Sequence, residues 1–279
     1  MSAVARVYDG VAHTYDADFS KLYERAHKGV IEQLRTFLPA AQGFSGNHPP
    51  NLGHALDLAV GTGLFWSRLR GQLAWESLTV NDVSASMLQC ARQKLPSCTA
   101  FQQGDSLCVP NWVPAGSKDF VTSHFLFSFL SRQAIYDTAN HLLRIGGLLS
   151  LATTTQQDLK ALYTGRFART GRLLRVERYI KRANTPVTHD ALGEELSSYG
   201  FEVLARTHLT PRFVLEGFED VRAWALESGW AASYFERFPR LKLSLATCAF
   251  RIAERVMYPL YPIVGNSDMS LYLVRKISA

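Results

Sequence analysis

The feature that most constrains this chain is an apolar run that breaks into a glycine turn. Residues 55–66 read ALDLAVGTGLFW, in which a strand carrying the acid Asp57 is followed by Gly61 and Gly63 and then by an apolar helix start. A strand, a glycine turn and a helix form a nucleotide-binding device, because glycine lets a ligand approach the backbone and the helix N-terminus presents free N–H groups. The pattern predicts an open sheet with a ligand site at this turn.

The alternation of strand and helix continues along the chain. A first helix is expected from Ser20 to Leu38, ending before Pro39, and a Pro/Gly/Asn-rich loop follows it. Strands are expected at 54–60, 77–83, 98–105, 118–124 and 148–154, and helices begin at 65, 84 and 131. The last of these helices is expected to close at Gly146 and Gly147, and Ser84 is placed to cap the one before it. Helices between short buried strands predict an α/β fold, a parallel sheet covered on both faces.

The composition bounds what kind of protein this is. The chain has 279 residues, of which 47% are hydrophobic, enough for one substantial core. Its longest apolar stretches are too short to span a bilayer, and its opening residues do not form a secretory signal, so we expect a soluble cytoplasmic protein without a membrane span. The four cysteines lack metal-ligand or disulfide spacing and are expected to be buried packing residues, and no metal site is predicted.

The pattern divides the chain into five parts. These are an N-terminal helical cap (1–38), a ligand-binding core (52–155), a basic insertion (156–190), the rest of the core sheet (191–209 and 270–279) and an aromatic-rich helical lid or substrate region (210–269). Residues 160–182 hold eight basic residues and one acid, Glu177, which indicates either a solvated face or attraction of an acidic partner.

Acids near the glycine turn restrict the ligand. Trp66 occupies the position where a dinucleotide-binding turn needs a small residue, and the Lys-Ser/Thr ending of a phosphate loop is missing. Asp57 would repel a pyrophosphate and favour a ligand with positive charge, and S-adenosylmethionine carries both a sulfonium and an ammonium without any phosphate. Asp82 ends the next strand, where an acid accepts ribose hydroxyls, and Asp105 ends the third, within reach of an adenine amino group.

These motifs resemble the class I S-adenosylmethionine-dependent methyltransferases, in particular the ubiquinone/menaquinone-methyltransferase-like branch. DLAVGTG is similar to the family's glycine loop, with Ala59 in place of its first glycine, and NDVSASML and GDS are similar to its ribose-side and adenine-side motifs. The opening VYDGVAHTYDADF resembles a family element that caps the cofactor, with Tyr8, Ala12, Tyr15, Asp16 and Phe19 expected on one helix face.

The resemblance implies a Rossmann-like seven-stranded sheet whose last strand is antiparallel, with a helical lid and insertions. It implies S-adenosyl-L-methionine as the cofactor. The residues that it places at the cofactor are Tyr15, Asp57, Ala59, Gly61, Gly63, Asp82, Val83, Met87, Asp105 and Ser106.

The acceptor of the methyl group is expected beyond the fourth strand, at the sheet's switch point. His124 lies there and is a candidate base or acceptor-orienting group, and Tyr8 or Tyr15 is a candidate to orient the acceptor from the cap. The alternative for His124 is a backbone contact to the cofactor or a packed loop histidine. The aromatics of 211–265 favour an apolar or aromatic metabolite, unless they only form the core of a helical subdomain.

We therefore expect a methyltransferase that acts on oxygen or nitrogen of a small, apolar or aromatic metabolite in secondary metabolism. One alternative is methylation of an acyl carboxylate on an acidic carrier protein, which the basic residues of 160–182 would contact. Another is a protein that binds S-adenosylmethionine without methylating, or that uses its sulfonium to promote a rearrangement. A nucleic-acid substrate is not favoured, because the sequence shows neither an RNA-binding module nor a matching catalytic motif.

Overall fold

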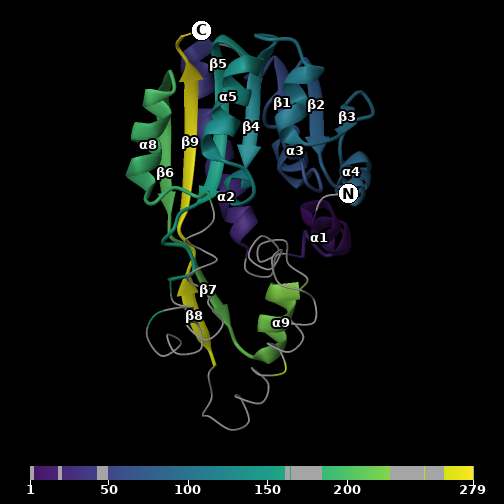
Figure 1. Ribbon diagram of the computed structural model, residues 1–279, viewed down its shortest axis with the longest axis vertical. Helices are drawn as coiled ribbons and strands as arrows, with labels where there is room; N and C mark the ends of the chain where they lie inside the picture. Colours follow the sequence, from purple (N-terminus) through teal and green to yellow (C-terminus); the bar gives the residue numbers. More distant parts are fainter. Residues whose placement is uncertain are drawn as a thin grey trace.

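The computed structural model describes residues 3–17, 21–42, 50–160, 184–226 and 261–278, together with positions 164 and 248. Its centre is a seven-stranded sheet in the order β3-β2-β1-β4-β5-β9-β6 (Figure 1). The strands of this sheet are β1 (His54–Asp57), β2 (Ser77–Asp82), β3 (Ala100–Gln103), β4 (Lys118–His124), β5 (Leu143–Thr154), β6 (Phe201–Leu209) and β9 (Met269–Lys276).

The direction of the strands follows the expected pattern. Strands β3, β2, β1, β4 and β5 are parallel to one another, whereas β9 lies antiparallel between β5 and β6. The expected seven-stranded sheet with an antiparallel last strand is therefore confirmed. Because β2 and β3 lie on one side of β1 whereas β4 and β5 lie on the other, the strand order switches at β1, and the carboxyl ends of β1 and β4 flank a crevice at this switch point.

Helices cover both faces of the sheet and divide the core in two. One apolar cluster contains residues of α2 (Leu22–Gln42), α3 (Leu64–Leu69) and α4 (Ala85–Lys94) packed on the sheet. The other contains residues of α5 (Arg132–Leu142), α8 (His189–Ser198) and the 3₁₀ helix η1 (Ser106–Asn111) on the opposite face. Strands buried on both faces explain the continuous apolar runs in the sequence.

Hydroxyl side chains begin three of these helices. Ser84, Ser131 and Thr188 each accept a hydrogen bond from a backbone N–H three residues later. Such a cap satisfies one of the N–H groups that a helix leaves open at its start. The predicted cap at Ser84 is confirmed.

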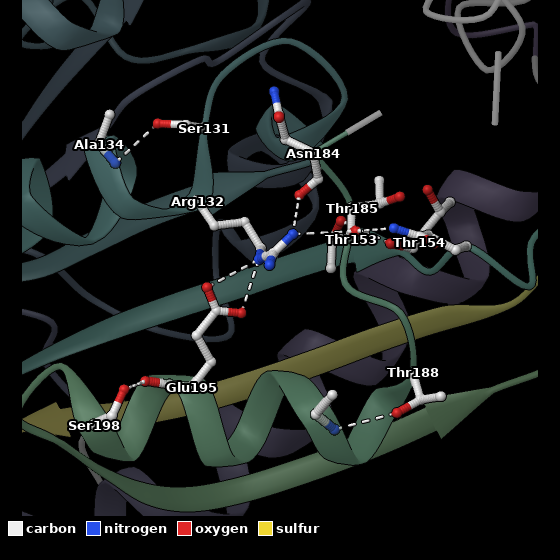
Figure 2. Close-up of polar contacts among 12 residues, drawn as sticks. Ser131, Arg132, Ala134, Thr153, Thr154, Asn184, Thr185, Thr188, Glu195 and Ser198 are labelled. Atoms are coloured by element: carbon white, nitrogen blue, oxygen red, sulfur yellow. Dashed lines mark hydrogen bonds and ion pairs between the residues drawn. The ribbon is translucent and has the colours of Figure 1, made fainter. Parts of the chain in front are cut away.

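Arg132 joins α5 to the segment that leads into α8 (Figure 2). Its Nε contacts both carboxylate oxygens of Glu195, at 3.0 and 2.8 Å, and its Nη1 donates to the carbonyl oxygens of Asn184 and Thr185. A fork of this kind fixes two helices and a connecting segment with one side chain. The return of the chain to the sheet after the basic insertion is thereby held in place.

Several expected boundaries differ from the structure. Helix α2 continues past Pro39 to Gln42, because a proline removes only one bond of the helical ladder and this helix ends within a turn of it. Helix α5 ends at Leu142, and Gly146 and Gly147 lie inside β5 and do not close the helix. The pairing of β4 with β5 is irregular at this point, and a side chain at Gly147 would meet the carbonyl oxygens of Arg144 and Lys118, at 2.9 and 3.1 Å.

The helix that was expected to carry Tyr8 through Phe19 on one face is shorter than expected. Helix α1 (Ala3–Val11) ends before Tyr15 and Asp16, which lie in the turn that follows, so these residues do not share one helix face with Tyr8. Gly10 in its last turn disfavours continuation of the helix. Phe19 lies outside the described residues.

A second, two-stranded sheet extends from the first. Strand β7 (Arg212–Leu215) pairs antiparallel with β8 (Ile263–Asn266), and α9 (Phe218–Leu226) follows β7 (Figure 1). The ends of the segment that was expected to be helical are therefore strands, because Leu215 and Ile263 pair across a large sequence separation that no local pattern reveals. The residues of the segment between 227 and 260, apart from 248, and most of the basic insertion lie outside the described residues.

Three further observations concern the expectations from composition. Among the described residues, no helix is long and apolar enough to cross a membrane, and no group of His, Cys, Asp and Glu is placed to hold a metal ion. The cysteines are free thiols. Cys98, Cys108 and Cys248 are exposed, so the expectation that they are buried packing residues is wrong for these three.

Candidate functional site

A cavity of about 180 Å³ lies at the carboxyl edge of the sheet, lined in part by residues of the N-terminal cap. Its described wall is built from the ends of β1, β2, β3 and β4 and from α1 and the turn after it. The lining residues are Val4, Tyr8, Tyr15, Ala59, Gly61, Asp82, Val83, Met87, Asp105, Ser106, His124, Phe125, Leu126, Phe129 and Leu130. Most residues predicted to contact a cofactor are thus brought to one place, which is also where β1 and β4 diverge.

Two predicted cofactor residues do not line this cavity. Asp57 is buried, and its carboxylate accepts hydrogen bonds from the Ala59 N–H at 2.9 Å and from the indole N–H of Trp66 at 2.7 Å. Burial raises the pKa of Asp57 to about 6, although these hydrogen bonds oppose the shift. Asp57 therefore stabilises the glycine turn by linking its first residues to Trp66 in α3.

Gly63 serves the packing of the same turn. Its φ is +76°, and a Cβ there would lie 3.2 Å from the backbone of Ala91 in α4. Both the left-handed conformation and the close helix contact require glycine. Gly63 lets α3 and α4 approach each other behind the turn.

Asp82 is the acid most firmly fixed at the cavity. One carboxylate oxygen accepts from the Gly61 N–H at 2.8 Å and the other from the Ser84 N–H at 2.9 Å. Burial raises the pKa of Asp82 to about 6, with the two backbone hydrogen bonds opposing and the nearby Asp57 adding to the shift. Each oxygen keeps a lone pair for a further donor, so the carboxylate is oriented for a ligand with hydroxyl groups.

The adenine-side motif places its two polar residues differently. The Asp105 carboxylate caps η1 through the Leu107 N–H at 2.9 Å, whereas the Ser106 hydroxyl donates to the Leu58 carbonyl at 2.7 Å. Ser106 is buried, so its hydroxyl ties η1 to the glycine turn. Asp105 remains the second acid of the cavity wall.

The other half of the wall is aromatic. The ring of Tyr8 lies 6.1 Å from that of Tyr15 and meets Phe129 edge-on at 5.6 Å, and Tyr15 stacks on Tyr23 at 5.0 Å. Phe125 adopts a left-handed backbone conformation, with φ of +60°, directly after β4. Such strain in a non-glycine residue is common at functional sites, and here it turns the chain into the cavity wall.

His124 lies where the aromatic half meets the end of β4. Its Nε2 is 3.0 Å from the hydroxyl of Ser150, and its ring meets Phe65 edge-on at 4.7 Å. Burial lowers the pKa of His124 to about 3. A histidine with so low a pKa is a weak base, which favours the acceptor-orienting alternative over the catalytic base.

The cap is fastened by two acids, Asp16, which belongs to the capping element named from the sequence, and Asp9, which sequence reasoning did not name. The carboxylate of Asp9 accepts from the Ser84 hydroxyl at 2.6 Å and from the Ser86 N–H at 3.2 Å, at the start of α4. Asp16 accepts from the Thr62 hydroxyl at 2.6 Å and from Lys94 Nζ at 2.5 Å. Tyr-Asp occurs twice in residues 8–16, which is the signal that could also have identified Asp9.

The cavity suits a cationic ligand that carries hydroxyl groups. Its described wall holds the two acids Asp82 and Asp105 and no lysine or arginine. At Gly61, φ is +54° and a Cβ would meet nothing within 4 Å, so the space above the turn is open to a ligand. This charge and shape fit the ribose, amino and sulfonium groups of S-adenosylmethionine and disfavour a pyrophosphate.

Comparisons with known proteins agree with this geometry. A family profile described as a methyltransferase domain matches residues 55–147, whereas no curated protein sequence matches the chain significantly. A Bacillus halodurans protein assigned as a methyltransferase is 16% identical, with a TM-score of 0.55 over 87% of this chain and 100% of its own.

Two ligand-bound structures are similar over most of this chain. A geranyl diphosphate methyltransferase in complex with GPP and sinefungin is 12% identical, with a TM-score of 0.51 over 92% of this chain and 79% of its own. Phosphoethanolamine N-methyltransferase 2 of Haemonchus contortus is 11% identical, with a TM-score of 0.51 over 90% of this chain and 53% of its own. At these identities the structural similarity shows a shared fold, and the matched profile is the evidence for a methyltransferase domain. Residues 55–147 are therefore a methyltransferase domain, and the chain as a whole has the fold of the methyltransferase structures to which it is similar.

Proposed function

We propose that this enzyme methylates oxygen or nitrogen of a small apolar or aromatic metabolite, as in secondary metabolism. The observation that carries this proposal is the apolar part of the cavity wall, which is lined by Tyr8, Tyr15, Phe125, Leu126, Phe129 and Leu130. Aromatic and aliphatic side chains offer apolar area and stacking, and they leave few polar groups to select the acceptor. Position and desolvation of the acceptor would supply much of the catalysis, because the cofactor brings an activated methyl group.

In this proposal the chain's residues divide the work between two halves of the cavity. The carboxylate of Asp82 accepts the ribose hydroxyls, and Asp105 accepts from the adenine amino group. Gly61, Ala59, Val83 and Met87 supply the surface on which the cofactor lies. The cap of residues 3–17 covers it, and the aromatic half holds the acceptor and excludes water.

A titration followed by a screen tests this proposal. Micromolar binding of S-adenosylmethionine and S-adenosylhomocysteine, with no binding of NAD, is expected by calorimetry. Hydroxylated, carboxylated and aminated arenes and terpenoids, and acyl groups on a carrier protein, are then incubated with the methyl donor, and products are detected by mass spectrometry. Transfer only to the carrier-bound acyl group would contradict the free metabolite, and tight cofactor binding without any transfer would favour a role other than methylation.

The ion pair between Asp16 and Lys94, which fastens the cap, gives a further prediction. Asp16→Asn should weaken binding of S-adenosylhomocysteine by about two- to fivefold, because a partly exposed ion pair contributes up to about 1 kcal/mol. Calorimetry measures the effect, and a faster dissociation rate in stopped-flow experiments should account for it. Asp190→Asn, which removes the exposed ion pair with Arg206, is the control and should leave the affinity unchanged. Equal affinities for Asp16→Asn and the wild type would argue against a covering role for the cap.

A further inference from the structure

We propose that His124 is a hydrogen-bond donor to the methyl acceptor through Nδ1–H, and that the acceptor atom is an oxygen that binds as an anion. This inference rests on the proposed function and narrows it from oxygen or nitrogen to oxygen. It names phenols, enols and carboxylic acids as the substrate class and makes His124 a positioning group.

The proton on the ring is located by Ser150. Ser150 is fully buried in β5, and among the described residues the one hydrogen bond of its hydroxyl runs to Nε2 of His124, at 3.0 Å. A buried hydroxyl that fails to donate loses a hydrogen bond without compensation from water, so the O–H of Ser150 points at Nε2. Nε2 is then the acceptor, and the ring proton of a neutral imidazole resides on Nδ1.

The other ring nitrogen is available to a ligand. His124 lines the cavity, and within the described part of the chain Nδ1 makes no hydrogen bond and is not among the buried polar atoms without a partner. The edge of the ring that carries Nε2 is turned to β5, and the ring packs against Phe65. The N–H group at Nδ1 is therefore offered to the cavity.

The surroundings keep His124 neutral. The titratable and charged groups around it are His27 of α2, whose ring lies 6.4 Å away, Arg68 of α3 behind His27, Tyr8 and Tyr15 of the cap, and the acids Asp82 and Asp105 of the wall. His27 is itself held neutral, because burial lowers its pKa and its Nδ1 accepts from the Arg68 guanidinium at 3.0 Å. Burial likewise lowers the pKa of His124 to about 3, so neither ring carries charge near neutral pH.

An N–H donor at this place discriminates between acceptor atoms. An oxyanion has three lone pairs and accepts the hydrogen bond from Nδ1–H while another lone pair attacks. A neutral amine has a single lone pair, and a hydrogen bond to it blocks the attack. No lysine or arginine stands in the described wall, so the positive sulfonium is the counter-charge that favours an anionic acceptor.

The reaction then needs no base on the enzyme. The acceptor gives its proton to water before it binds, and its oxygen uses a lone pair to form the new C–O bond. The C–S bond of the donor breaks with its electron pair on sulfur, so that cation and anion yield two neutral groups at the reacting centre. The value of kcat/KM should therefore increase with pH, with a midpoint at the acceptor's own pKa. This midpoint should move when the acceptor is changed.

The tautomer can be measured without any turnover. In enzyme labelled with ¹⁵N-histidine, two-bond ¹H–¹⁵N correlation at neutral pH should show Nδ1 of His124 protonated and Nε2 bare. The His124→Asn spectrum assigns the signal among the eight histidines. In Ser150→Ala this preference should be lost, because the hydroxyl that donates to Nε2 is absent. A proton on Nε2 in the wild-type enzyme would overturn the proposal.

Activity measurements test the choice of oxygen. His124→Asn keeps an amide donor near the position of Nδ1, and His124→Gln places its amide near Nε2. Against a hydroxyarene, His124→Gln should lower kcat/KM by about 10- to 150-fold, the scale of a hydrogen bond to a charged group, and His124→Asn by clearly less. Cofactor affinity should stay at the wild-type value in both variants, which shows that they are folded.

Matched acceptors complete the test. The wild-type enzyme should methylate the hydroxyl member of each hydroxy/amino pair at least about tenfold faster than the amino member. Faster transfer to the amine, or a pH midpoint that stays fixed when the acceptor's pKa is changed, would overturn the proposal. Failure to bind cofactor or to methylate any acceptor would instead count against the proposed function, since the tautomer is measured independently of it.

Discussion

Replacing Asp82 with alanine is expected to weaken binding of S-adenosylhomocysteine by about 10- to 150-fold. Hydrogen bonds to a charged group contribute about 1.5–3 kcal/mol, and the ribose hydroxyls would lose their acceptor. The variant also frees the N–H groups of Gly61 and Ser84, which loosens the turn beneath the cofactor. Calorimetry with the product measures the affinity without turnover. Wild-type affinity in Asp82→Ala would refute the ribose role.

Two controls separate the ribose contact from a general loss of structure. Asp82→Asn keeps one carbonyl oxygen and should lose less affinity than Asp82→Ala. Asp105→Ala removes the second acid of the wall and its contact with the Leu107 N–H, so it tests whether any acid of the cavity has the same effect. The free energy of unfolding of each ligand-free variant, obtained by denaturant titration, shows whether the turn has been disrupted.

The raised pKa of Asp82 adds a dependence on pH. Its pKa of about 6 in the folded protein means that the carboxylate becomes protonated as the pH falls through 6, and cofactor affinity should fall with it. In Asp82→Asn this loss of affinity should be reduced. Because the folded pKa is above the unfolded one, the contribution of this group to stability is fully present below about pH 4 and declines as the pH rises to about 6.

The second large effect is expected at Trp66. Trp66→Phe should lower the free energy of unfolding by about 2–4 kcal/mol, because it removes the indole donor to a buried carboxylate and leaves a cavity. Trp66 is fully buried, and its ring meets Trp75 and Phe120 edge-on. Denaturant unfolding at pH 7 measures the change.

The matched control is Trp112→Phe, a substitution of the same kind at a side chain that is 40% exposed. Its cost should stay within about 0.5 kcal/mol. The cost of Trp66→Phe should also shrink below pH 6, where Asp57 is protonated and its hydrogen bond with the indole is no longer charge-assisted. Equal costs for the two tryptophans, or no change with pH, would contradict the role of the Asp57 contact.

The same pair of residues shows how far sequence reasoning reaches. The alternation of strands and helices predicts the sheet, and the spacing of Asp82 and Asp105 brings both to the cavity, because strand ends on one edge are fixed by topology. The side chain of Asp57 turns away from the cavity toward Trp66, nine residues later, and that contact depends on the shape of the turn. In the sequence, Trp66 only indicated a poor fit to a dinucleotide site.

Other features depended on contacts between distant segments. The pairing of β7 with β8 joins residues about fifty positions apart, and nothing local in either strand selects the partner. The tautomer of His124 likewise depends on Ser150, which lies on the neighbouring strand. A periodic pattern predicts which residues are buried, whereas the direction of a polar side chain needs the partner on the next element.

The pairing of β6 with β9 has a consequence for how this enzyme can diversify. Leu209 and Met269 are partners across the two strands, so residues 210–268 leave and re-enter the sheet at adjacent points. Topologically this whole segment is the loop of a β-hairpin, and a short turn could replace it without shifting the register of any core strand. The length and composition of this segment can therefore change during evolution. The cofactor turn follows β1, which lies two strands from β5, so such changes need not alter its geometry.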